Sequence, residues 1–326
     1  MAFAQRRFAL PIGLFAGLAI LWLALIAVAL AVPTPIALFL TLPIGGVIGL
    51  LFIVGHDACH NSLTGSTPLN HLIGRLAFLP SLHAFSLWDL SHNRTHHRFN
   101  NIEGLDHGWV PMSPQAYRDA SGLRRLGYRI TRTPLGVGLF YLFGLWLPRL
   151  FVPLPWIVGA TRRVYWVDSA LVLAFLVAQI VAVLAWGGGN GKSAVESLAV
   201  GIVLPFLVWN AMMSFIIFLH HTHPAVRWYR TVADWRADQG ALRGTVHVRF
   251  PGPVDSMVLS IMEHNAHHLT PGVPLYNLSR MQTALEDGNT LIVWRFSWRA
   301  YVRICRVCKL YDYDAQRWVG YDTVGA

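Results

Sequence analysis

The chain has 326 residues, of which 54% are hydrophobic and only 13% are charged, and its formal net charge is +10. An ordinary soluble domain carries about 25% charged residues, so these values exclude a purely soluble protein. They also argue against a nucleic-acid-binding protein, because the basic residues do not gather into clusters laced with aromatic side chains.

Four long apolar runs predict membrane spans. They cover about 9–31, 35–55, 165–187 and 195–219, each close to the roughly 20 residues that cross a hydrocarbon core. The first run exceeds the roughly 7–15 apolar residues of a secretory signal, so we expect an uncleaved anchor. A fifth run, 134–159, is interrupted by three prolines and an arginine. We expect this run to lie at the membrane interface or to re-enter the membrane.

The basic residues predict the orientation of these spans. Of the 26 Lys and Arg residues, 25 precede the first span, lie between the second and third, or follow the fourth. By the positive-inside rule, both termini and the polar segments 56–164 and 220–326 are cytoplasmic. We therefore predict an all-α integral membrane protein, with 1–326 as a single domain. It would have four transmembrane helices, interfacial helices and a cytoplasmic histidine-rich cap, and a bacterial inner membrane is the expected location.

The three cysteines predict neither a disulfide framework nor a thiolate metal site. Disulfides are rare in the cytoplasm, and the lone C-x-x-C of Cys305 and Cys308 has no second pair with which to build a four-thiolate zinc site. We expect Cys59 to be a small packed side chain.

The fifteen histidines carry the strongest chemical signal. None lies in the interior of a predicted span, and eight fall into three short boxes with the sequences HDACH, HNRTHH and HNAHH. On an α-helix, residues three or four apart share one face, so each box offers two or three ring nitrogens to one point. The isolated His71, His83 and His247 are expected to be ordinary interfacial or loop residues. The box histidines are His56, His60, His92, His96, His97, His264, His267 and His268.

The number of rings restricts the kind of metal site. A structural zinc takes four protein ligands and a catalytic zinc usually three, so eight or nine imidazoles exceed one such site and fit two metals. Imidazole suits zinc, copper, iron and nickel alike, so the histidines alone leave the metal open. Metal binding requires neutral rings, so occupancy should weaken as the pH falls below about 6.5.

Beyond the boxes, the sequence resembles the membrane fatty acid desaturases, whose three boxes have the forms H-x(3–4)-H, H-x(2–3)-H-H and H-x(2–3)-H-H. The stretches FSLWDLSHNRTHH, FLHHTHP and EHNAHHLTPGVPLYNL resemble family elements, as does Asp106 followed by WVP, and together they cover roughly 50–290 in family order. The x(3) first box resembles the Δ12 and ω-3 acyl-lipid enzymes more than the acyl-CoA Δ9 enzymes. Two departures are His220, where that subgroup usually has Gln, and the three intervening residues of the second box.

The resemblance implies a non-haem di-iron centre held by the eight box histidines and a ninth ligand after the last span. His221 is chosen over His223 as that ninth ligand, and no catalytic residue is expected beyond the metal ligands. Asp57, Asp106, Asn265 and, if it is not itself a ligand, His223 are candidates to orient ligating rings through their second nitrogens.

The implied reaction is O2-dependent removal of two hydrogens from an acyl chain, giving a cis double bond. General acid-base catalysis does not break unactivated C–H bonds. The G-x-S-x-G motif of a nucleophilic serine is also missing from the sequence. The acyl tail would enter a dry tunnel, for which Trp88, Trp209 and Tyr276 are candidate lining residues, although interfacial aromatic belts use the same residue types. Electrons would come from a ferredoxin or a similar small donor protein, since the chain shows no haem domain, flavin fingerprint or iron–sulfur spacing.

Three other functions remain open at the level of sequence. A hydroxylase, ketolase or acetylenase would use the same centre and the same first C–H abstraction. It would differ only in what becomes of the substrate radical that this step leaves. The second is a non-enzymatic membrane carrier of haem or metal; haem-binding bundles place paired histidines within their spans, whereas these lie beyond them. A zinc-dependent hydrolase is disfavoured because H-E-x-x-H and G-x-S-x-G are both missing.

Overall fold

The computed structural model describes residues 3–159, 162–288 and 290–324. The chain divides into two compact units. Unit 1 comprises, among the described residues, 3–4, 91–145 and 214–324, and unit 2 comprises Gln5–Leu90 and Trp146–Met213. The prediction of one domain over 1–326 stays a prediction.

Unit 2 contains three helices, and most of a fourth, that are long and apolar enough to span a membrane; the fourth continues along the chain into unit 1 from Ser214. The four candidates are Ala9–Ala31 (α1), Thr34–Cys59 (α2), Arg163–Gly189 (α10) and the continuous helical run Ala194–His221. That last run consists of α11 (Ala194–Leu198), η3 (Ala199–Val203) and α12 (Leu204–His221). The four predicted spans are confirmed, and three of them extend beyond the predicted bounds because apolar helices continue into the flanking residues. The all-α membrane fold is confirmed with them.

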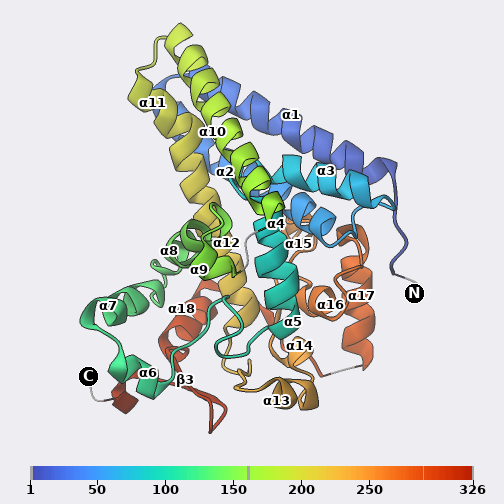
Figure 1. Ribbon diagram of the computed structural model, residues 1–326, viewed down its shortest axis with the longest axis vertical. Coiled ribbons are helices and arrows are strands. Elements are labelled where there is room, and N and C mark those ends of the chain that lie inside the picture. The colour runs from blue at the N-terminus through green and yellow to red at the C-terminus, as the bar shows by residue number, and fades with distance from the viewer. Residues whose placement is uncertain (1–2, 160–161, 289, 325–326) are drawn as a thin grey trace. The chain divides into compact units, whose positions relative to one another are not determined.

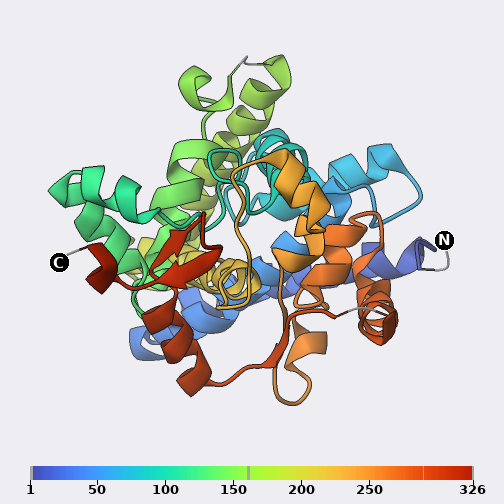
Figure 2. The same cartoon turned by 90° about the horizontal axis from the view of Figure 1, so that it is seen from below.

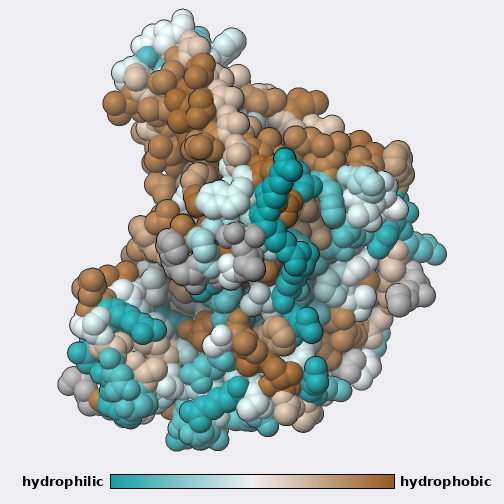
Figure 3. Space-filling view, viewed as in Figure 1, coloured by the Kyte–Doolittle hydropathy of each residue, from teal (hydrophilic) through white to brown (hydrophobic). Residues whose placement is uncertain are grey.

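The surface of these helices is apolar. Ile20, Phe39 and Val181 are 67%, 75% and 63% exposed, and the space-filling view is brown over α10 and α11 (Figure 3). A helix that is apolar on its outer face as well as its inner face suits a lipid environment.

The turn between α10 and α11 is closed by local contacts. Ser193 caps α11, because its hydroxyl accepts from the backbone N–H of Glu196 while the Glu196 carboxylate accepts from the N–H of Ser193. Such a reciprocal capping box satisfies two otherwise unpaired donors. Gly187 lies so close to Ser197 that a Cβ there would come within 2.1 Å of its hydroxyl oxygen. The glycine therefore lets α10 and α11 lie side by side (Figure 1).

A partly buried ion pair links shorter elements of unit 2 to α10. Arg75 of α3 (Thr67–Phe78) lies 2.8 Å from the carboxylate of Asp168 in α10. The same carboxylate accepts from the backbone N–H of Ser86 in α4 (Phe85–Trp88). This carboxylate therefore joins three helices of the unit. The described part of unit 2 also contains α9 (Pro155–Val158).

Unit 1 consists of short helices and two small sheets around an aromatic core. The core includes the fully buried Trp109, Phe218 and Trp228. Its helices are α5 (His97–Phe99), α6 (Pro114–Asp119), α7 (Gly122–Thr131), α8 (Val137–Phe140), α13 (Val232–Ala237), α14 (Gly240–Arg243), α15 (Val254–Met257), α16 (His264–Leu269), α17 (Leu275–Gly288), α18 (Trp298–Val307) and η4 (Tyr321–Val324). Two π-helices, η1 (Asp89–His96) and η2 (Tyr141–Leu150), join the residues of one unit to those of the other along the chain.

The sequence predicted no strands, yet unit 1 has two short pairs. β1 (His247–Arg249) pairs in parallel with β2 (Val293–Arg295), with Val248 opposite Trp294. β3 (Leu310–Asp312) pairs antiparallel with β4 (Arg317–Val319), and Figure 2 shows this hairpin in red close to the C-terminus. Strands of three residues are too short to leave a period-two pattern in the sequence.

The interrupted run at 134–159 becomes short helices rather than a span. α8 and η2 form one apolar helical stretch, Val137–Leu150, and Pro148 lies inside it. All three cysteines are buried and none forms a disulfide, and Cys305 and Cys308 belong to the core of unit 1.

Candidate metal centre

The second histidine box forms part of a π-helix. His92 and His96 lie in η1 and His97 begins α5. In an α-helix, residues five apart diverge by about 140° around the axis, whereas the wider π turn closes i to i+5. The Nε2 atoms of His92 and His97 accordingly lie 3.1 Å apart. The α-helical face expected from the sequence is therefore wrong for this box.

Four rings of unit 1 form one cluster, here called the four-histidine cluster. All four are buried, and each offers a nitrogen within 4.8 Å of the others. The Nε2 atoms of His221 and His264 are 3.0 Å apart. Two nitrogens that each bind a metal at about 2.1 Å lie about 3 Å apart when they subtend roughly a right angle, so this spacing suits a shared ion. The members are His96, His221, His264 and His268.

Outer partners hold two of these rings in the tautomer that binds metal. The Nδ1–H of His96 donates to the carboxylate of Asp106 at 2.8 Å. The Nδ1–H of His221 donates to the carbonyl of Gly244 at 3.0 Å, and the side-chain oxygen of Asn101 lies 3.2 Å from the same nitrogen. An acceptor at Nδ1 leaves the lone pair at Nε2, the arrangement common in metal-ligating histidines.

Asp106 is fixed in its charged form. Burial alone would raise the pKa of this carboxyl, but the neighbouring His96, by charge and by hydrogen bond, outweighs burial and lowers the pKa to about 2. The backbone N–H groups of Asn101 and Gly108 also donate to it, at 2.8 and 3.1 Å. A permanent negative charge behind His96 strengthens that ring as a ligand.

Three further rings of unit 1 form a second group, here called the three-histidine cluster. It consists of His92, His97 and His267, whose nitrogens also lie within 4.8 Å of one another. The two clusters are neighbours, because the rings of His97 and His268 stack with centroids 4.3 Å apart. The second and third boxes therefore each divide their rings between the two clusters, instead of each box serving one point.

The first box lies in unit 2. His56 is the last basic residue of α2 and His60 follows its end, and their ring centroids are 4.7 Å apart. The expected proximity within this box is thus present, and its assignment to the metal centre stays a prediction.

The rings of unit 1 fit a bound metal. His268 is buried, and neither of its ring nitrogens has a hydrogen-bond partner among the described residues. Burial, followed by the neighbouring histidines, holds the pKa values of His264 and His268 well below the ordinary value. Metal coordination requires neutral imidazoles whose nitrogens converge. The donor chemistry suits iron, zinc, copper or nickel.

The structure separates the two candidates for the ninth ligand. His221 belongs to the four-histidine cluster. His223 is half-buried, stacks near Trp294, and accepts from the backbone N–H of Ala225. Its described hydrogen bond is to the loop, and a role for His223 in orienting a ligating ring stays a prediction.

Of the two other orienting candidates, Asn265 makes its described contacts away from the ring nitrogens, and the orienting role of Asp57 stays a prediction. Asn265 donates to the backbone carbonyls of Leu242 and Thr245 and to the Thr245 hydroxyl. It was expected to orient a ring, and its described hydrogen bonds instead join α16 to Leu242 in α14 and to Thr245 just after it. Asp57 is buried near the end of α2, where its backbone carbonyl accepts from Ser62.

The candidate tunnel residues fall in different units. Trp88 and Trp209 are buried in unit 2 and both contact Phe52, with centroids 4.8 and 5.4 Å away. Tyr276 is half-buried in α17 of unit 1. A tunnel lined by all three stays a prediction.

Sequence reasoning missed three residues that shape the four-histidine cluster. Asn101 and Gly244 accept from His221, and no motif marks either of them. A Cβ on Gly244 would lie 2.7 Å from the Asn100 amide nitrogen, so glycine is what allows this close approach. His220, noted only as a departure from the family pattern, stacks on His264 with centroids 3.7 Å apart.

The sequence profile of the family described as "Fatty acid desaturase" matches residues 31–299. Since this match spans most of the chain, the protein belongs to the fatty acid desaturase family. It is therefore an enzyme of lipid metabolism that desaturates fatty acyl chains, and its apolar helices make it a membrane protein.

Curated relatives agree with this membership. The chain is 31% identical to the "sn-1 oleoyl-lipid 12-desaturase" of Synechocystis sp., over 84% of this chain and 75% of the relative. The protein of that name from Picosynechococcus sp. is 30% identical, over 80% and 73%. The "Omega-6 fatty acid desaturase, chloroplastic" of Brassica napus is 28% identical, over 80% of this chain and 57% of the relative.

Proposed function

We propose that the protein introduces a cis double bond at position 12 of an oleoyl chain carried by a membrane lipid. The support is its similarity to the cyanobacterial lipid 12-desaturases along most of both chains. The balanced reaction is –CH2–CH2– + O2 + 2 e⁻ + 2 H⁺ → –CH=CH– + 2 H2O. One O2 is thus reduced to two waters by two electrons from the substrate and two from a donor.

The single observation that carries the mechanism is the pair of adjoining histidine clusters in unit 1. We assign one iron to each cluster and add His56 and His60 of unit 2 to the three-histidine cluster, because their H-x-x-x-H spacing offers two more neighbouring rings. When bound, the irons supply the chemistry with O2 that breaks unactivated C–H bonds. The nine ligands would be His56, His60, His92, His96, His97, His221, His264, His267 and His268.

The protein's own residues prepare the site. The His264 and His268 imidazoles stay neutral because burial lowers their pKa values. Asp106 and the Gly244 carbonyl fix the rings of His96 and His221 so that Nε2 faces the centre. Burial also excludes water, which limits side reactions of an oxidising centre.

The electrons would come from a ferredoxin-like donor protein. The positive net charge of +10 favours association with an acidic partner. We place the enzyme in a bacterial inner membrane with the histidine-rich part and both termini in the cytoplasm, where such donors occur, because the Lys and Arg distribution favours that orientation.

The test is expression in a bacterial host that makes oleate but no polyunsaturated lipid. Mass spectrometry of the lipids should show linoleoyl chains, and a His264→Ala variant should give none. If the lipids instead contain hydroxylated, ketolated or triple-bonded chains and no new alkene, the proposal is wrong and the protein catalyses one of these related oxidations.

Metal analysis of the purified protein separates the remaining alternatives. We expect about two irons per chain, as two clusters require. Haem absorption would support a carrier, and one zinc per chain would support a hydrolase, and either result would contradict the di-iron assignment.

A further inference from the structure

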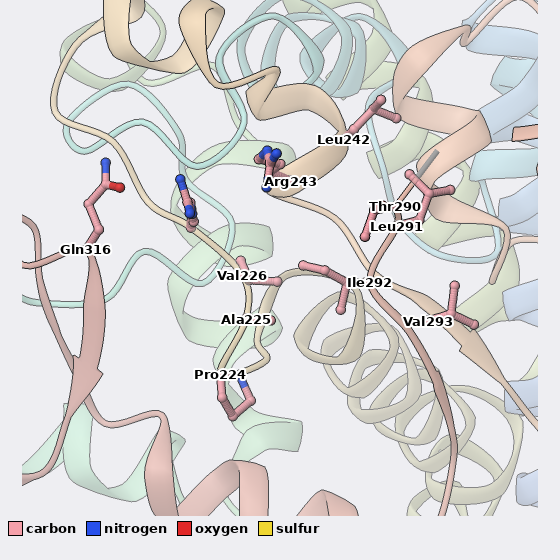
Figure 4. A pocket seen from close by; sticks show the side chains of 11 residues that line it. Pro224, Ala225, Val226, Leu242, Arg243, Thr290, Leu291, Ile292, Val293 and Gln316 are labelled. Atoms are coloured by element: carbon pink, nitrogen blue, oxygen red, sulfur yellow. The ribbon is translucent and has the colours of Figure 1, made fainter. Parts of the chain in front are cut away.

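A pocket of about 520 Å³ lies in unit 1, outside the histidine clusters. Its apolar side is formed by Leu291 and Ile292 with neighbouring residues, and its polar side by Arg227, Arg243 and Gln316. Figure 4 shows Gln316 on one side, Leu291, Ile292 and Val293 on the other, and Arg243 between them. Gln316 and Arg243 are exposed, so a partner can reach them.

The charge at this pocket is positive. Arg227 and Arg243 both contact one carboxylate, that of Asp238, at 2.9 and 3.1 Å. Tyr229 also donates to it, at 2.8 Å. Two guanidinium groups against one carboxylate leave one positive charge, and the arginine side chains remain 42% and 51% exposed. The carboxylate holds the arginines in place without cancelling their charge.

One short segment, the end of α14 and the two residues after it, links the pocket to the four-histidine cluster. Residues 242–245 begin with the pocket-lining Leu242 and Arg243 and continue to Gly244, whose carbonyl accepts from His221. A second link passes through Asn101, which contacts His221 with its oxygen and donates to the Arg227 carbonyl at 3.0 Å.

A third link reaches the other half of the same cluster. The Leu242 carbonyl accepts from the side chain of Asn265, the residue that follows His264. Pocket-lining residues are therefore one or two hydrogen bonds from two predicted ligands, His221 and His264. Few intervening atoms favour electron transfer into the cluster from this side.

We infer that this pocket is the docking site of an acidic one-electron carrier protein, and that the segment 242–245 carries its electrons to His221 and His264. A surface carboxylate of the carrier would pair with Arg243, and apolar side chains beside it would contact Leu291 and Ile292. Each reduced carrier gives up one electron and leaves oxidised, so two dockings supply the two electrons of one turnover. This inference rests on the proposed function for its redox role.

The test uses the full-length protein in detergent and a purified plant-type [2Fe–2S] ferredoxin as the probe. Affinity is measured by calorimetry at low and high salt, and transfer is followed as reoxidation of reduced ferredoxin. Arg243→Glu should weaken binding about 10-fold and flatten its salt dependence, because charge complementarity acts mainly on association and is screened by salt.

Two further variants change the charge without touching the arginine–carboxylate contacts. Gln316→Lys should tighten binding about 3-fold and Gln316→Glu should weaken it by a similar factor, as expected for exposed charges. A tightened complex cannot result from misfolding. The matched control is Arg303→Glu on α18, an exposed arginine outside the pocket, which should leave the affinity within about 2-fold.

The inference is overturned if ferredoxin does not bind, if both Gln316 variants bind like the parent, or if Arg303→Glu weakens binding as much as Arg243→Glu. These outcomes do not depend on product formation. If ferredoxin binding depends on these charges but no alkene forms, the docking site is supported and the proposed desaturation is rejected. If alkene forms but ferredoxin binding does not depend on these charges, the desaturation is supported and the docking site is rejected.

Discussion

Unit 1 and unit 2 both bury histidines, and the surroundings differ. In unit 1, seven rings face one another in two adjoining clusters, with a carboxylate and a carbonyl behind two of them. In unit 2, His83 is buried among Phe52, Phe78, Trp88 and Trp209, and its Nδ1–H donates to the Ser81 carbonyl. Burial alone therefore does not identify a metal ligand, and convergence of several neutral nitrogens does.

The largest effect is expected for His264→Ala. Removing one of four converging nitrogens should lower both iron content and alkene formation, the latter by more than about 100-fold, since even outer-shell changes cost roughly 10–100-fold. Elemental analysis and lipid mass spectrometry measure the two quantities. The matched control is His83→Gln, which should keep its iron. Loss of iron in both variants would contradict the distinction drawn between the clustered histidines of unit 1 and His83 of unit 2.

Asp106→Asn should have the next largest effect. The amide still accepts from His96 but carries no charge, so affinity for iron should fall about 10-fold, measured by competition with a chelator. Asp119→Asn, at an exposed aspartate of α6, serves as the control. Equal affinities for iron in the parent and the Asp106 variant would show that this carboxylate does not strengthen metal binding.

His83 should make stability depend on pH. Burial, opposed by the hydrogen bond to Ser81, lowers the pKa of this ring to about 3 from an ordinary 6.5. The folded state therefore binds the proton less readily, so its stability is complete above pH 6.5 and decreases as the pH falls. Near pH 5 the loss should be about 2 kcal/mol. Thermal unfolding in detergent should show this loss of stability in the parent and a smaller loss in His83→Gln. If the stability of the two proteins changes equally with pH, His83 is not the cause.

The smallest effect is expected for His223→Ala. This ring lies outside both clusters and contacts Trp294 and the backbone of Ala225, so iron content and activity should change less than about 2-fold, as for most surface substitutions. His221→Ala, two residues earlier, should lose iron. Iron loss in the His223 variant alone would reverse the choice of the ninth ligand.

Much of this organisation was predictable from the sequence. The four apolar runs predicted the spans because a bilayer demands about 20 apolar residues whatever the packing. The spacing of the boxes and the elements around them predicted the family, which the profile match at 31–299 confirms. The short β1–β2 and β3–β4 pairs escaped prediction because three residues carry too little pattern.

The sequence by itself determined which side chains can bind metal, since residue type and local spacing fix the donor chemistry. Only the tertiary structure decided which nitrogens share a cluster. The π-helix turned His92 toward His97 and left His96 with His221, and a glycine 23 residues away supplied the carbonyl that orients His221. These outcomes depend on helix winding and on contacts between distant segments, for which no local pattern exists.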